Sequence, residues 1–429
     1  MTRARRPLLV PVLAAVGLAL LMWVVYLIAS PELIDQPPHD FSTPGPPPSG
    51  HVGITLAANL GAPRSTGNRV ELLVNGDEIF PAMLQSIRDA RESINLLTYV
   101  YWRGEIAQTF AQELAAAARR GVRVRVLLDA FGSRKIDPAW VDAMRRAGCE
   151  VAWFAPLKWN AMHRYNNRTH RKVLVVDGKV GFTGGVGIAE EWTGDAQDAD
   201  HWRDDHFRIE GPAVRHLQGS FAQNWRRATG VVLAGEELFP ELPAKGEGEV
   251  VVVSAAAGER FRGIPLTYWI LFRSARETLR IATPYYVPDP DLELGVLDAA
   301  RRGVKVTLLV PGPHQDSALV RYAARSYYRE LLEVGVRIHE YQPTLMHTKL
   351  VMVDDRWALI GSPNMDSRSF ELNDEIALAV SEADLMRDLS ASYAADLAVS
   401  RQVTPRDVPD NAVFRRIRDR GARLLREQL

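Results

Sequence analysis

One pattern of reactive side chains occurs twice in this chain, and this duplication constrains the fold more than any other feature. The pattern His-x-Lys-x-x-x-x-Asp comprises His170, Lys172 and Asp177 and recurs 177 positions later as His347, Lys349 and Asp354. Each copy lies in an apolar run and is followed, seven residues after the aspartate, by a turn of small residues, Gly184-Gly185 or Gly361-Ser362. Matching motifs with matching surroundings predict two halves of similar fold.

Within each copy the histidine and the lysine are expected to share one face of a strand, because residues two apart on a strand project to the same side. Asp177-Gly178 and Asp354-Asp355 fall between two apolar runs, which is typical of a hairpin turn. We therefore expect each aspartate to brace its motif. A single copy would also fit a core histidine beside a lysine that reaches to solvent, but the second copy favours chemistry.

The remaining elements also recur in order. Ala-Arg-Glu leads into an apolar segment at 94–101 and again at 279–287, and Ala-Arg-Arg-Gly ends a helical run before 122–128 and 304–310. Gly148 and Gly335 each follow a further helix. Helices that alternate with apolar strands predict an α/β fold with mixed sheets covered on both faces, divided into domains at 68–240 and 241–403. A pseudo-two-fold axis between them would bring both histidine-lysine pairs to one cleft.

Composition excludes several classes of site. The chain has 429 residues with 52 basic and 52 acidic side chains, so no overall basic field favours nucleic acid. Cys149 is the only cysteine, which rules out an internal disulfide and a cysteine-based zinc cage. His201 and His206 come nearest to a metal site, but a solvated polar loop explains them equally well, and we expect no metal. Phosphate-loop and serine-elbow motifs do not occur.

The two ends of the chain have compositions of their own. Residues 1–30 are predicted to form a single-pass membrane anchor because 8–29 are almost entirely apolar; the alternative is a long signal peptide. Arg3, Arg5 and Arg6 place the N-terminus in the cytoplasm and the catalytic part on the other face of the cell membrane. Residues 31–67, rich in proline and glycine, predict a spacer. The arginine-rich tail, 404–429, fits a membrane-surface helix or an ordinary solvated helix.

The flanks of the two motifs resemble those of one enzyme family. They include the stretches Asn167-Arg168-Thr169-His170-Arg171-Lys172, Trp202-Arg203-Asp204, Ile209-Glu210-Gly211-Pro212-Ala213-Val214, Thr283-Pro284-Tyr285-Tyr286-Val287-Pro288-Asp289 and Gly361-Ser362-Pro363-Asn364-Met365-Asp366-Ser367-Arg368-Ser369. Over about residues 68–403 the chain is similar to the phospholipase D superfamily and, within it, to the bacterial cardiolipin synthases. The resemblance implies two phospholipase D-like α/β/α domains that act on phospholipid.

Phosphodiester cleavage requires a nucleophile, an acid for the leaving alkoxide and positive charge on the phosphate oxygens, and two imidazoles with two ammonium groups supply this set without a cofactor. The resemblance implies that His170 is the nucleophile and His347 the acid and base, although the residues alone leave the reverse order open. Both lysines, Asn364 and Ser362 are expected to hold the phosphate, and Glu375 to orient an imidazole.

The chain departs from the family pattern at one position. Asn364 stands three residues after the first glycine of its turn, as is usual in the family, but the first copy has Gly187 there. A phosphate-facing amide is therefore missing from the first half, which suggests an altered substrate, slower chemistry or, in a different class of protein, a weakened lipid-binding scaffold.

The sequence favours a membrane-anchored phosphatidyl transferase that joins two phosphatidylglycerols into cardiolipin and releases glycerol. The alternative is a phospholipase D that transfers to water or to another alcohol. A nuclease of the same superfamily is disfavoured by the neutral charge and the apolar N-terminal segment.

Overall fold

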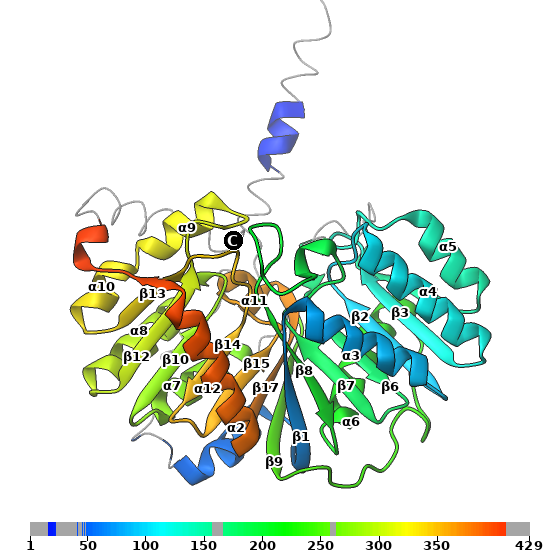
Figure 1. The fold of residues 1–429 in the computed structure, drawn as a ribbon, viewed down its shortest axis with the longest axis horizontal. Helices are drawn as coiled ribbons and strands as arrows, with labels where there is room; N and C mark the ends of the chain where they lie inside the picture. Colours follow the sequence, from blue (N-terminus) through cyan, green and yellow to red (C-terminus); the bar gives the residue numbers. More distant parts are fainter. Residues whose placement is uncertain are drawn as a thin grey trace, which may run out of the picture.

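The computed structural model of the chain describes residues 16–22, 41, 45, 47, 49–156, 166–257 and 263–408. Two halves lie side by side and meet at β1 and β9, which run through the centre of the molecule (Figure 1). The first half contains the elements β1 (Arg64–Val74), α3 (Asn75–Asp89), β2 (Ser93–Thr98), α4 (Glu105–Arg119), β3 (Arg123–Asp129), α5 (Pro138–Arg146), β4 (Glu150–Phe154), β5 (Arg168–Thr169), β6 (Val173–Val176), β7 (Val180–Gly184), η4 (Glu190–Trp192), β8 (Asp205–Glu210) and α6 (Val214–Thr229).

The second half repeats this order with additional short elements. It contains β9 (Gly248–Ala255), α7 (Gly263–Ser274), β10 (Thr278–Ala282), β11 (Tyr286–Val287), α8 (Pro290–Arg301), β12 (Lys305–Pro311), α9 (Ala318–Arg325), α10 (Tyr328–Glu333), β13 (Arg337–Tyr341), β14 (Leu350–Val353), β15 (Trp357–Gly361), β16 (Met365–Asp366), α11 (Ser367–Glu371), β17 (Asn373–Ser381), α12 (Ala383–Ala398), β18 (Ser400–Gln402) and η5 (Pro405–Asp407).

One continuous mixed sheet crosses both halves. From the central pair the order runs β1-β8-β7-β6-β2-β3-β4 on one side and β9-β17-β15-β14-β10-β12-β13-β18 on the other. In each half, three strands are parallel (β2, β3 and β4; β10, β12 and β13), and the strands nearer the centre are antiparallel. The predicted α/β class with a mixed sheet is confirmed. Apart from β18 at one edge, the order of strands outward from β1 and β9 is the same in both directions, as expected from the duplication.

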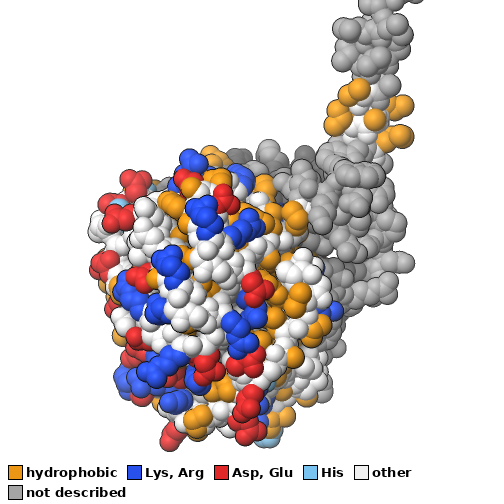
Figure 2. All heavy atoms as spheres, turned by 90° about the vertical axis from the view of Figure 1, so that its right-hand side faces the viewer, with side chains coloured by type: hydrophobic (Ala, Val, Ile, Leu, Met, Phe, Trp, Pro, Cys, Tyr) orange, Lys and Arg blue, Asp and Glu red, His pale blue; other side chains and the backbone are white. Residues whose placement is uncertain are grey.

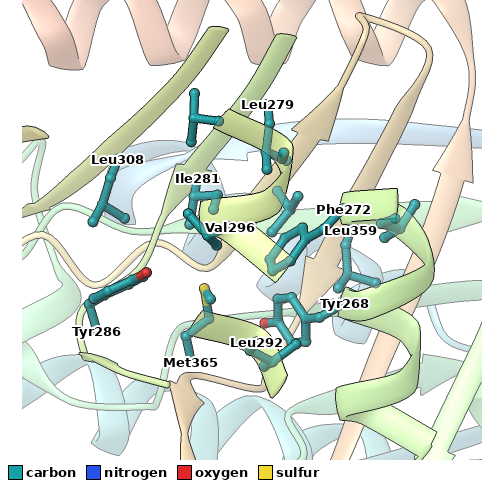
Figure 3. Packing of buried hydrophobic residues seen from close by; sticks show 14 of the residues in the cluster. Tyr268, Phe272, Leu279, Ile281, Tyr286, Leu292, Val296, Leu308, Leu359 and Met365 are labelled. Carbon is teal, nitrogen blue, oxygen red and sulfur yellow. The ribbon is translucent and has the colours of Figure 1, made fainter. Parts of the chain in front are cut away.

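Helices cover both faces of this sheet and form three apolar cores. Helices α3, α4 and α5 cover one face of the sheet in the first half, and α7 and α8 cover the corresponding face in the second. Figure 3 shows part of the second core, in which Tyr268 and Phe272 of α7 pack with Leu279 and Leu359 of the sheet. The third core is shared, because Phe221 of α6 and Leu389 of α12 belong to the same buried cluster. The shared core and the continuous sheet join the two halves into one packed body.

The glycines expected to end helices have the backbone conformation that this role requires. Gly121 follows α4 with φ of 92°, and Gly303 follows α8 with φ of 89°. Residues that have a Cβ rarely adopt this backbone conformation. Each then leads directly into a buried strand of the parallel set. The helix-to-strand order inferred from these residues is therefore confirmed.

The stretch 31–67, expected to be a spacer, is folded in its second part. A 3₁₀ turn, η2 (Ser49–His51), leads into α2 (Val52–Leu60), and β1 already begins at Arg64. Val52, Leu56 and Leu60 repeat every four residues and are buried in the core of the second half. This apolar stripe, and not the proline and glycine content, determines the structure there.

Much of the predicted anchor and most of the arginine-rich tail lie outside the described residues. Residues 16–22 are helical, and their apolar side chains are exposed, as Figure 2 shows at its upper right. In the part of the chain described here, no helix has the length and apolar character needed to cross a membrane. On the face seen in Figure 2, basic and acidic side chains are interspersed and form no large basic patch.

Candidate active site

The two histidine-lysine pairs lie just before β6 and β14, the first strands of two equivalent hairpins. β6 pairs with β7 and β14 with β15, both antiparallel, and all residues of β6 and β14 are buried. The imidazoles and ammonium groups are themselves buried, with His170 9% and His347 7% exposed. Burial of four ionisable side chains is costly unless partners compensate them, so their contacts define the site.

His170 is held by the other half of the molecule. Its backbone N–H donates to the carbonyl of Asp374 at 2.9 Å, where β5 runs parallel to the start of β17. Its Nδ1 lies 2.9 Å from Oε1 of Glu375, the next residue. The sequence predicted that Glu375 orients an imidazole, and it contacts His170 from across the boundary between the halves. With Nδ1–H donating to the carboxylate, the Nε2 lone pair of a neutral His170 remains available.

His347 has the same arrangement with the roles of the halves exchanged. Its backbone N–H donates to the carbonyl of Arg203 at 2.7 Å, and its Nδ1 lies 2.6 Å from Oδ2 of Asp204. Asp204 is thus the counterpart of Glu375. Sequence reasoning assigned Asp204 no role. The stretch that contains Asp204 comes directly before β8, and Asn373-Asp374-Glu375 begins β17, which is the equivalent strand of the second half. Alignment of the two halves on these strands is the signal that would have identified it.

Each lysine lies against the histidine of its own motif. Lys172 Nζ donates to the carbonyl of its own motif's His170 at 2.9 Å, and Lys349 Nζ contacts the carbonyl of His347. Lys349 Nζ also lies 3.0 Å from Nδ1 and 3.2 Å from Nε2 of His347. A position almost equally far from both ring nitrogens does not lie along the lone pair of either one. We therefore assign the Nδ1 proton to the hydrogen bond with Asp204.

Electrostatic effects cross between the motifs. Burial lowers the pKa of Lys172 to about 7, the Glu375 carboxylate opposes this, and the neighbouring Lys349 lowers it further. Burial likewise lowers the pKa of Lys349 to about 8, against the effect of Asp204 and Glu375. Lys349 also lowers the pKa of His170 and Lys172 that of His347, so the charges of each motif act on the other motif and both belong to one site. Such a concentration of perturbed groups is typical of a catalytic site.

Burial favours the neutral form of both imidazoles. Burial lowers the pKa of His170 to about 4, with Glu375 opposing and Lys172 contributing to the shift. Burial also lowers the pKa of His347 to about 3, with Lys349 contributing and Asp204 opposing. A phosphodiester anion bound between the lysines would offset their charge, and would therefore raise both histidine pKa values.

The remaining predicted site residues surround Glu375 and the turn after β15. The Ser362 hydroxyl donates to Oε2 of Glu375, and the Asn373 side-chain amide donates to Oε1 at 3.3 Å. Asn364 is buried, and among the described residues its side-chain oxygen has no hydrogen-bond partner. A buried amide without a partner for its oxygen remains a candidate for contact with substrate.

Gly187, the departure from the family pattern, lies in a space that another side chain fills. A Cβ at this position would meet Val100 Cβ at 2.6 Å and Trp192 Cζ3 at 3.2 Å. The ring of Trp192 in turn packs edge-on against His347, with centroids 5.4 Å apart. An asparagine would not fit at position 187 without movement of these neighbours.

The motif aspartates are not brought to the imidazoles. Oδ1 of Asp177 accepts the backbone N–H groups of Glu92 at 2.7 Å and Ser93 at 2.9 Å, and Oδ2 accepts that of Arg91 at 3.0 Å. Asp354 makes the same three contacts at the start of β10. Both lie at the far ends of β6 and β14 from the histidines and tie the hairpin to the neighbouring strand, which is the bracing role expected from the sequence and not a catalytic one.

The candidate metal ligands do not form a cluster. His201 Nδ1 lies 2.7 Å from Asp198 Oδ1 in a loop, whereas His206 is buried on β8. Across the described ranges, no three histidine, cysteine, aspartate or glutamate side chains are placed to hold a metal ion together. The positive charge next to the histidines is that of the two lysines.

The fold and the site define a duplicated phospholipase D-like protein in which each half supplies one histidine, one lysine and one orienting carboxylate. Residues 83–225 and 268–397 match the family model described as cardiolipin synthase, PLD-like domain. The cardiolipin synthase of Geobacillus kaustophilus (strain HTA426) is 36% identical over 87% of this chain and 75% of its own length. Cardiolipin synthase 2 of Bacillus anthracis is 35% identical over 86% and 73%. The chain therefore belongs to the cardiolipin synthase family of PLD-like proteins.

Solved structures share the fold at low sequence identity. The phosphatidylserine synthase of Haemophilus influenzae Rd KW20 matches with a TM-score of 0.66 and 14% identity, over 88% of this chain and all of that one. The polyphosphate kinase of Porphyromonas gingivalis matches with a TM-score of 0.54 and 13% identity, over 91% of this chain and 57% of that one. At these identities the likeness concerns the fold alone.

Proposed function

We propose that this protein is a phosphatidyltransferase that condenses two phosphatidylglycerols into cardiolipin and glycerol. The observation that carries the proposal is the pair of buried imidazoles, each bound through Nδ1 to a carboxylate of the opposite half, beside two buried lysines. Two imidazoles that are oriented through Nδ1 and lie next to positive charge suit a double displacement at phosphorus. Membership of the cardiolipin synthase family supports the lipid substrate.

In the first step His170 Nε2 attacks phosphorus, and the bond from phosphorus to the glycerol oxygen breaks. Glu375 stabilises the positive charge that develops on the imidazole. The bound phosphodiester raises the pKa of His347, which takes up a proton from solvent. His347 then donates its Nε2 proton to the leaving glycerol oxygen, so the products are glycerol and a phosphatidyl-histidine. Both lysines, with Asn364, hold the non-bridging oxygens.

In the second step His347, now neutral, removes the proton from a hydroxyl of a second phosphatidylglycerol. The resulting oxygen attacks phosphorus, the phosphorus-nitrogen bond to His170 breaks, and cardiolipin is released. Both imidazoles return to their starting protonation, which balances the cycle. Two displacements predict retention at phosphorus and ping-pong kinetics.

The proposal includes attachment to the cell membrane through residues 1–30, with the catalytic part on the non-cytoplasmic face. Support comes from the apolar run at 8–29 and from the exposed apolar side chains of the helical residues 16–22, among them Leu18 and Met22. Phosphatidylglycerol would then enter from the bilayer to which the protein is tethered.

The test is incubation of the full chain with labelled phosphatidylglycerol in vesicles, followed by lipid mass spectrometry. Wild type should form cardiolipin and glycerol, whereas His170→Ala and His347→Ala should each lose turnover by at least about a thousandfold. His51→Ala, an exposed histidine at the start of α2, is the matched control and should behave as wild type.

Two outcomes would contradict the proposal. Phosphatidic acid as the main product would identify a hydrolase in place of a transferase. Lipid binding without any product and without a trappable phosphohistidine would identify a scaffold.

A further inference from the structure

The two orienting carboxylates are anchored differently in the two halves. Glu375 accepts a hydrogen bond from the hydroxyl of Ser362, in the turn after β15. The equivalent position after β7 is Gly185, which has no hydroxyl to offer. A side chain there would overlap the carboxylate of Asp204, because a Cβ at Gly185 would lie 2.1 Å from Oδ1 of Asp204. The backbone N–H of Asp205 donates to Oδ1 of Asp204 at 2.9 Å, so any side-chain donor to this carboxylate comes from a residue outside the turn.

Trp192 supplies this donor. Its indole Nε1–H donates to Oδ2 of Asp204 at 2.9 Å, the same oxygen that contacts His347 Nδ1 at 2.6 Å. Trp192 is 3% exposed, stands at the end of η4, and together with Val100 fills the space beside Gly187. Trp192 thus packs where a side chain at position 187 would have to fit, and it donates to the carboxylate of Asp204 as Ser362 donates to that of Glu375.

We propose that Trp192 is a positioning residue for the leaving-group acid: through Asp204 its indole N–H holds His347 with Nε2 directed at the glycerol oxygen. This inference rests on the proposed function, because it assigns His347 to proton transfer. The substitution of glycine at 187 is then one half of an exchange that keeps the site active, and not a sign of a weakened enzyme.

The charge distribution around Asp204 supports this role. Burial opposes ionisation of Asp204, but Lys349 and His347, together with the hydrogen bond from Trp192, hold its pKa below the usual value. Loss of the indole N–H removes one of the contacts that keep this carboxylate ionised and fixed in place. A mobile or protonated Asp204 no longer directs the Nδ1 proton of His347.

The experiment compares two leaving groups in wild type and in Trp192→Phe. Phosphatidylglycerol needs a proton on its departing glycerol, whereas phosphatidyl-p-nitrophenol releases a stable phenolate without one. Trp192→Phe should slow cardiolipin formation about tenfold or more, the loss expected for a hydrogen bond to a charged group. Its single-turnover release of p-nitrophenol should stay within about twofold of wild type.

Trp202→Phe is the matched control for ring packing. Trp202 contacts the same imidazole with centroids 5.7 Å apart and contacts Trp192 at 4.6 Å, but no hydrogen bond joins its indole to Asp204 in the described structure. Its replacement should change the rates for both substrates by the same factor.

Equal losses with both substrates in Trp192→Phe, or no loss with phosphatidylglycerol, would overturn the inference. If Trp192→Phe does not fold, the test uses benzothienylalanine at position 192. This residue keeps the outline of the indole ring but has sulfur in place of the N–H, so the same two outcomes can be measured with it. A wild type that leaves phosphatidylglycerol unchanged would refute the proposed substrate instead. The leaving-group comparison would then use phosphatidylcholine, with the same two results.

Discussion

Replacement of Asp177 by asparagine is expected to destabilise the protein while leaving the chemistry of each folded molecule intact. The carboxylate accepts three backbone N–H groups at the start of β2, from Arg91, Glu92 and Ser93. An asparagine keeps one oxygen and turns an NH₂ group toward the remaining donor. A hydrogen bond to a charged group contributes about 1.5–3 kcal/mol, and the partly exposed site lets water replace some of it. We expect a loss of about 2 kcal/mol.

This loss should appear as a lower melting temperature of about 4–8 °C, since 1 kcal/mol corresponds to about 2–4 °C in a domain of 150–250 residues. Five residues of extended chain, roughly 16 Å, separate Asp177 from Lys172, too far for direct contact with the phosphate. The assays are thermal unfolding and cardiolipin formation per folded molecule at a temperature well below the transition.

Asp355→Asn is the control, because Asp355 also lies in a motif turn but is exposed and pairs with Arg280 at 2.8 Å on the surface. Such a pair contributes about 0–1 kcal/mol, so its loss should be small. If Asp177→Asn melts as wild type does yet turns over at least about a hundredfold more slowly, the aspartate has a chemical role and our structural assignment is wrong.

Two further predictions concern the buried charges. Lys349→Met should lower kcat/KM about a hundredfold while the protein still melts cooperatively, because it removes an ammonium group next to His347; unchanged kcat/KM would exclude this lysine from transition-state stabilisation. The pKa values of His170 and His347, lowered to about 4 and about 3, mean that the unfolded chain binds more protons than the folded one between these values and 6.5. The free energy of unfolding, measured by urea titration, should therefore fall as the pH drops below about 6.5, and the double variant His170→Ala/His347→Ala should flatten this dependence; the same slope in both proteins would contradict the assigned pKa shifts.

Much of the architecture was predictable because it depends on local patterns. Apolar runs of four or five residues, bounded by turn residues, mark β6 and β14, and left-handed glycines such as Gly121 mark helix ends. The error at 52–67 has a local cause too. Proline and glycine content over the whole stretch was given more weight than the three-residue apolar stripe that places α2 in the core.

The sequence by itself determined the duplication, the α/β class, the two histidine-lysine pairs and the turn aspartates, because each depends on residues close together in the chain. Only the tertiary structure decided which carboxylate serves which imidazole: Glu375 lies 205 residues from His170, and Asp204 lies 143 residues from His347. The same holds for the ring of Trp192 in the space beside Gly187. These contacts depend on how the halves pack about β1 and β9 and on the volumes left between their loops, which no spacing along the chain records.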